Sequence, residues 1–99
     1  MSELTLQQLL DHGLTLRQLE HWVARDLLRP ITFGHGVPRQ WPQEELRVAD
    51  LMRRLVTAGF TAEAAARAAR AHLAGRPLVP LVPGVVLAID TDLLTREET

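Results

Sequence analysis

The sequence predicts a mainly α-helical fold with small β elements, a winged helix-turn-helix of four helices followed by a C-terminal β-hairpin and a short terminal helix. Three observations lead to this prediction. Residues 4–9, LTLQQL, return ten positions later as residues 14–19, LTLRQL, so two similar helix starts follow one another closely. Glycines and prolines then interrupt residues 29–41, and helical periodicity resumes over residues 42–74.

Length and composition favour one globular unit. The 99 residues are 46% apolar, which is enough for one modest core. We expect residues 1–76 to form the winged helix-turn-helix and residues 77–99 an added hairpin and helix. Cysteine is absent, which excludes disulfides, thiolate zinc sites and thiol catalysis. The N-terminus lacks a signal-peptide pattern and no apolar run is long enough for a membrane span, so a cytoplasmic location is expected.

Charge is unevenly distributed along the chain. The net charge is −1, but residues 13–76 hold ten arginines and six acidic residues, a balance of +4. The N-terminal and C-terminal segments contribute −2 and −3. Every basic side chain other than histidine is arginine, which suits bidentate contacts to phosphate or guanine but is better explained by GC-rich coding.

The first two predicted helices are joined by a very short turn. The first runs from about Thr5 to His12 and ends at Gly13, which can adopt a positive φ. The second, residues 15–26, begins with a capping box in which Thr15 is followed three positions later by Gln18. Such a pair is a helix-turn-helix, or alternatively an αα-hairpin that only builds a helical bundle.

The second helix has two different faces at 3.6 residues per turn. An apolar stripe is expected to face the core: Leu16, Leu19, Val23 and Leu27. A polar set projects from the opposite side: Arg17, Gln18, His21 and Arg25.

Residues 30–41 are predicted to form a β-hairpin, the wing. Ile31 and Phe33 alternate with Thr32, and Gly34 and Gly36 supply the turn. His35 and Arg39 would lie on or beside this wing, within reach of a sugar-phosphate backbone. The alternative for Arg39 is an ordinary solvated charge.

Two longer helices follow the wing. The third is expected from Pro42, in the first helical position, to Ala58, with acidic residues in its first turn. The fourth begins at Thr61, contains many alanines and ends at Gly75. Arg67 and Arg70 are predicted to form an exposed basic pair on it.

The C-terminal segment predicts strands at Leu78–Val82 and Val85–Ile89, joined by a type II turn at Pro83-Gly84. A short helix capped at Asp90 or Thr91 follows. Because neither strand alternates between apolar and polar residues, both faces of this hairpin are expected to be covered. The hairpin either closes the core of its own chain or pairs with a second chain, and we predict a homodimer through residues 77–94.

With these elements in order, the chain resembles the DNA-binding domain of the MerR family over residues 4–74. The resemblance is carried by the runs at residues 13–23 (GLTLRQLEHWV), 26–30 (DLLRP), 38–46 (PRQWPQEEL) and 59–61 (GFT). Glu20 stands where the family has an arginine, so Glu20 either points to the edge of the core or pairs with a neighbouring arginine. The family's paired tyrosines are His21 and Trp22 here, and its long dimerisation helix and effector domain are missing.

The resemblance implies a sequence-specific regulator that binds double-stranded DNA, with the helix at residues 15–26 in the major groove and the wing on the backbone. Base contacts are expected from Arg17, Gln18 and His21. Phosphate contacts are expected from Arg25, His35, Arg39, Arg53 and Arg54. The alternative is a MerR-like module of the chaperone-modulator type that binds a protein partner. No enzymatic activity, metal or other cofactor is expected, because the four histidines lack ligand spacing and no nucleophile has a nearby base.

Overall fold

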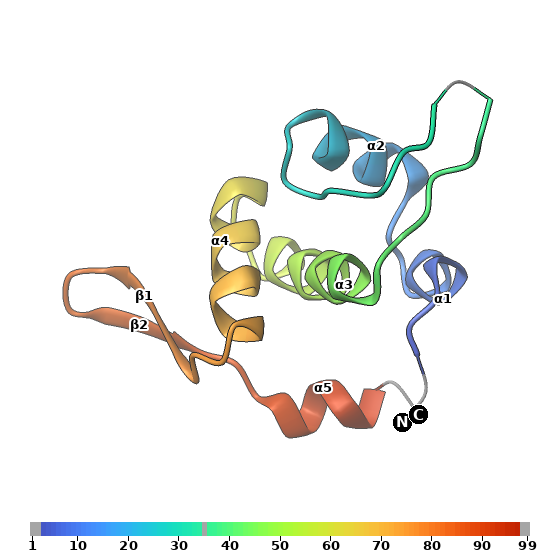
Figure 1. Ribbon diagram of the computed structural model, residues 1–99. Helices are drawn as coiled ribbons and strands as arrows, with labels where there is room; N and C mark the ends of the chain where they lie inside the picture. Colours follow the sequence, from blue (N-terminus) through green and yellow to red (C-terminus); the bar gives the residue numbers. More distant parts are fainter. Residues whose placement is uncertain (1–2, 35, 98–99) are drawn as a thin grey trace.

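The computed structural model describes residues 3–34 and 36–97, which form five helices and one two-stranded antiparallel hairpin (Figure 1). The predicted fold class is therefore confirmed. Within the described residues, none of these helices is long and apolar enough to cross a membrane. The elements in chain order are α1 (Leu6–Asp11), α2 (Leu16–Ala24), α3 (Gln43–Thr57), α4 (Ala62–Leu73), β1 (Leu78–Val82), β2 (Val85–Ala88) and α5 (Thr91–Glu97).

The helix boundaries follow from capping groups in the sequence. Thr5 and Thr15 each form a complete capping box with the glutamine three residues later, and Thr61 caps α4. Pro42 occupies the N-cap of α3 and not its first helical position, so α3 begins one residue later than expected and has no side-chain cap.

The helices α1 to α4 end in the same way, with a residue of positive φ directly after the C-cap. Glycine supplies this conformation after α1, α3 and α4. After α2 the residue is Asp26, with φ 60°, and the amide of Leu27 donates to the carbonyl of Trp22 at 2.9 Å. The second helix is therefore shorter than the predicted residues 15–26, because a non-glycine residue forms its terminating turn.

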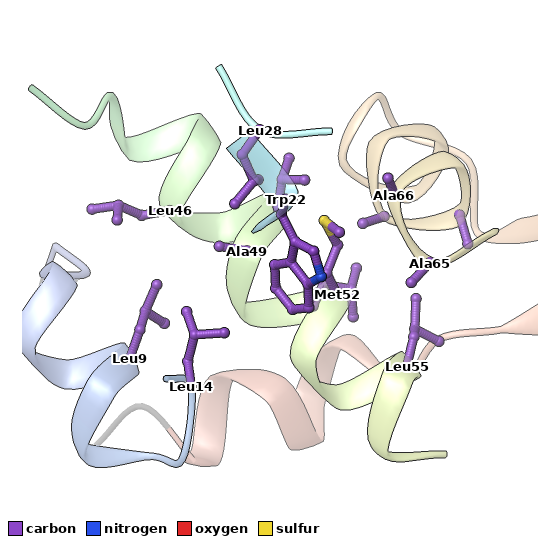
Figure 2. Close-up of a cluster of buried hydrophobic side chains, with 14 of the residues drawn as sticks. Leu9, Leu14, Trp22, Leu28, Leu46, Ala49, Met52, Leu55, Ala65 and Ala66 are labelled. Carbon is purple, nitrogen blue, oxygen red and sulfur yellow. The ribbon is translucent and has the colours of Figure 1, made fainter. Parts of the chain in front are cut away.

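The hydrophobic core lies around α3, which supplies more buried residues than any other described helix. Figure 2 shows Trp22 of α2 among side chains of this cluster, including Met52 and Ala49 of α3. The alanines of α4 allow this helix to pack closely on α3, and Ala65 and Ala69 are completely buried. The core thus fixes α2 against α3, which determines the face that α2 presents to solvent.

One part of the predicted apolar stripe is wrong. Leu19 and Trp22 are buried, but Leu16 is 60% exposed. Leu16 is the first residue of α2, and Leu27 follows the end of the helix. The buried face of α2 is built from Leu19 and Trp22, and Val23 and Leu27 pack against the core while partly exposed.

The predicted wing strands do not form. Residues 30–41, the wing loop, contain one isolated antiparallel bridge, in which Ile31 and Gln40 exchange backbone hydrogen bonds of 2.8 and 2.9 Å. Pro30 and Pro38 have no N–H to extend the ladder, and Phe33 and Val37 remain exposed, so no buried face stabilises the strands. His35 lies outside the described residues.

The C-terminal hairpin forms as predicted, with Val79 opposite Leu87 and Gly84 at φ 85° in the turn. It projects from the body of the molecule beside α4 (Figure 1). Val79 is buried and Leu87 partly buried against the core, but Leu78, Val82 and Val86 are more than half exposed. The expectation that both faces are covered is wrong for the single chain, because only the α4 side has a neighbour.

Candidate nucleic-acid interface

The exposed face of α2 carries two polar side chains with no partner among the described residues, Arg17 and His21. They stand four positions apart, so they project from the same side of the helix. Leu19 and Trp22 anchor the opposite side in the core. Packing of α2 on α3 therefore leaves a guanidinium and an imidazole free to donate hydrogen bonds to an external ligand.

Gln18 lies on the same helix but is engaged by the backbone. Its side-chain oxygen accepts from the backbone N–H of Thr15 at 3.2 Å, while the backbone N–H of Gln18 donates to the Thr15 hydroxyl at 3.0 Å. A glutamine that reads adenine uses its carboxamide oxygen and nitrogen together. Because the capping box already uses this oxygen, Gln18 can bind a base only if its hydrogen bond to Thr15 breaks.

Two of the predicted phosphate contacts are held in exposed ion pairs. A guanidinium nitrogen of Arg39 lies 2.5 Å from a carboxylate oxygen of Glu20, and Arg25 pairs with Glu63. The Glu20 pair joins the wing loop to α2, so the second of the two outcomes expected for Glu20 is confirmed. Exposed pairs of this kind contribute at most about 1 kcal/mol, so a phosphate could compete for either arginine.

Arg53 and Arg54 occupy a different environment. Both bind the carboxylate of Asp50, which is only 5% exposed, with nitrogen–oxygen distances of 2.8 and 3.3 Å. Both arginine side chains are largely buried. They neutralise a buried acid within α3, and a phosphate could reach them only by competing with that acid.

The Glu45 carboxylate at the N-terminal end of α3 is a second buried acid with several partners, and no pattern in the sequence indicates it. Arg70 of α4 donates to both of its oxygens, at 2.9 and 2.8 Å, and the backbone amide of Arg29 donates at 2.7 Å. The same guanidinium donates to the carbonyl of Leu27 at 2.9 Å. This cluster attaches the chain between α2 and the wing loop to both long helices.

The prediction that Arg67 and Arg70 form an exposed basic pair is therefore wrong. Arg67 is exposed, whereas Arg70 is half-buried and bonded to Glu45. The side-chain hydrogen bonds from Arg70 hold the pKa of Glu45 below its usual value, against the opposing effect of burial. The spacing of residues 45 and 70 in the sequence contains no signal for this pair, because two helices must first pack to bring them together.

The arginines without a described ion-pair or hydrogen-bond partner come from four different segments. Among the arginines whose side chains the structure describes, they are Arg17, Arg47, Arg67 and Arg76. Only Arg17 belongs to the predicted interface. In residues 3–34 and 36–97, no group of three or more histidine, aspartate or glutamate residues is arranged to hold a metal ion.

Comparison with protein families identifies the helical part of the chain. The model of the MerR HTH family regulatory proteins matches residues 5–72, which span α1 to α4 except for the last residue of α4, Leu73. The chain belongs to the MerR family. Membership of this family indicates a DNA-binding transcription regulator, and proteins of the family are typically not enzymes.

The match locates the family resemblance in the helix-turn-helix, the wing loop and the two long helices, and it ends before the hairpin β1–β2. No curated protein and no solved structure matches the chain.

Proposed function

We propose that this MerR-family protein is a cytoplasmic, sequence-specific regulator that inserts α2 into the major groove of double-stranded DNA. The observation that carries the proposal is the face of α2, where Arg17 and His21 are exposed and have no partner in the described part of the chain, on a helix anchored to the core by its other side. An arginine can bind the O6 and N7 atoms of guanine in bidentate fashion, and an imidazole can also donate to a purine edge. Gln18 would contribute once its capping bond exchanges with a base.

Phosphate contacts would come from the arginines beside this helix. Arg25 lies at the C-cap of α2, and Arg39 is held next to α2 by Glu20. Both ion pairs are exposed, so replacing a carboxylate by a phosphate costs little desolvation. The expected backbone contact of His35 stays a prediction, while Arg53 and Arg54 would contribute only long-range charge.

We further propose that two copies bind DNA together through residues 77–94. Residues 77–89 contain no charged side chain, and the outer face of the hairpin exposes Leu78 and Val86. A two-stranded hairpin with an uncovered apolar face is marginally stable alone, and pairing with an identical face would cover it. Two linked helix-turn-helix units also bind two half-sites more tightly than one unit.

Titration of labelled genomic fragments with the protein, followed by gel shift over a series of salt concentrations, tests the DNA proposal. Each neutralised phosphate contributes about −0.9 to the slope of log affinity against log salt, and four to eight contacts are expected for a dimer. A response to salt that is flat would contradict binding through these arginines. Light scattering on the full chain and on residues 1–76 tests the dimer, and a monomeric full chain at high concentration would refute it.

A protein-interaction module of the chaperone-modulator type is the second candidate. The ion pair between Glu20 and Arg39 favours it, because a carboxylate on the proposed DNA face repels phosphate. In this case Arg17→Ala would leave DNA retention unchanged and abolish association with a protein partner. The two candidates therefore predict opposite outcomes for the same variant.

A further inference from the structure

A groove of about 480 Å³ runs between α4 and β1, away from the α2 face. Ala64, Ala68 and Ala71 form its α4 wall, and Val79 and Leu81 line the β1 side. The alanines lie at spacings of four and three residues, so they share one face of α4 and leave it smooth. An apolar side chain of another segment could approach the α4 backbone closely here.

The rim of this groove is positively charged. Arg67 and Arg76 line it, and both are exposed and lack a partner among the described residues. Among the residues that the structure describes, no acidic side chain lines the groove. Most other described arginines are neutralised by carboxylates, so these two stand out as cations beside an apolar floor.

This combination specifies the chemistry of an occupant. The floor requires apolar anchors, and the two guanidinium groups favour carboxylates along the edge of the bound segment. Nucleic acid offers charge without an apolar anchoring side, so it fits the floor poorly. An amphipathic protein segment that carries leucines and acidic residues satisfies both requirements.

The backbone of β1 favours a helix over an added strand. Pro80 lies in the middle of β1 and has no N–H, so the strand cannot offer a continuous edge to an incoming strand. The small α4 alanines, in contrast, permit close helix packing. We propose that the groove binds an acidic amphipathic α-helix of another protein, a role that goes beyond DNA binding and does not depend on it.

A second copy of this chain is a poorer occupant. The segment at residues 90–97 is acidic, but α5 uses Leu94 to pack against its own core and exposes Leu93. One free leucine does not provide the repeated anchors that a helix places in a groove. The occupant is therefore expected to be a different protein.

Fluorescence anisotropy with a labelled helical peptide tests the proposal on the full-length protein. The probe carries leucines at positions i, i+3, i+4 and i+7 and glutamates elsewhere, and a matched peptide carries lysines in place of the glutamates. We expect the glutamate peptide to bind and each of Arg67→Glu and Arg76→Glu to weaken it by about threefold to tenfold. Ala64→Trp, which fills the groove from a position outside the core cluster, should abolish binding.

Arg47→Glu is the matched control, since Arg47 is an exposed arginine on α3 that has no ion-pair partner among the described residues and does not line the groove. It should leave peptide affinity unchanged, and thermal melting should show that all variants are folded. Equal binding of the lysine peptide, or equal effects of the Arg47 and Arg67 reversals, would overturn the proposal. So would tight binding of a peptide of residues 89–99, because it would make a second copy the occupant.

Discussion

The hydrogen bonds that Arg70 and the Arg29 amide donate to Glu45 should contribute a large part of the free energy of unfolding of this domain. Arg70→Met would leave the Glu45 carboxylate, which is 8% exposed, with only the amide of Arg29 as a described donor. A buried charge that loses its partner typically costs about 3–5 kcal/mol. The Arg70 side chain is 32% exposed, so water can partly replace it, and we expect about 3 kcal/mol for this variant.

Substitution of the other partner, Glu45→Leu, removes the acceptor and leaves the Arg70 guanidinium with only the carbonyl of Leu27 as a described acceptor. Since Arg70 is more exposed than Glu45, the expected loss is smaller, about 2 kcal/mol. The double variant removes both charges together. It should therefore be more stable than the sum of the single effects predicts, by about 1–2 kcal/mol.

Urea unfolding at pH 7 of the four proteins in this cycle measures these differences. Arg67→Met, an exposed arginine one turn away on α4, is the control and should change the free energy of unfolding by less than about 0.5 kcal/mol. Additive single effects, or a loss below about 0.5 kcal/mol for Arg70→Met, would refute the claim that this ion pair holds α4 to the segment after α2.

Three further substitutions and one pH titration test the ends of α2, the ion pair between Glu20 and Arg39, and the charge of Glu45. Thr15→Ala removes the N-cap of α2 and should cost about 1 kcal/mol in urea unfolding. Asp26→Gly relieves the positive φ at the end of α2 and should stabilise by about 0.5–1 kcal/mol, whereas a loss would show that the ion pair between Asp26 and Arg29 matters more. Glu20→Gln frees Arg39 and should strengthen DNA binding on all sequences alike; an unchanged affinity would place Glu20 outside the interface, and a weaker complex would show that Glu20 positions Arg39. Because folding lowers the pKa of Glu45, its stabilising effect is complete above the unfolded pKa and is lost as the pH falls through the lower, folded pKa, so Glu45→Leu should be less acid-sensitive than the native protein.

Local signals in the sequence were sufficient for most of the helical fold. The capping boxes at Thr5 and Thr15 and the glycines after three helices act within a few residues, so they could be recognised without tertiary structure. The end of α2 was misplaced because Asp26 takes the left-handed conformation that glycine usually adopts. The wing strands were overpredicted because alternation at Ile31 and Phe33 indicates a strand only when one face becomes buried.

The candidate site was less predictable than the fold. Helical periodicity correctly placed Arg17 and His21 on the exposed side of α2, but it could not reveal which arginines have acidic partners. The pairs from Arg25 to Glu63 and from Arg39 to Glu20 join residues far apart in the sequence. Buried Asp50 likewise changes Arg53 and Arg54 from expected phosphate ligands into partners of an internal charge.

The role of the α2 face is tested most directly by Arg17→Ala, measured by anisotropy on the preferred duplex and on a scrambled duplex, with Arg47→Ala as a matched loss of one exposed arginine. Loss of a bidentate guanine contact should cost about 1–3 kcal/mol on the preferred duplex and much less on the scrambled one, with thermal stability unchanged. Arg47→Ala should weaken binding to both duplexes slightly and equally. An Arg17→Ala protein that binds the preferred duplex as tightly as the native protein would contradict DNA recognition by α2.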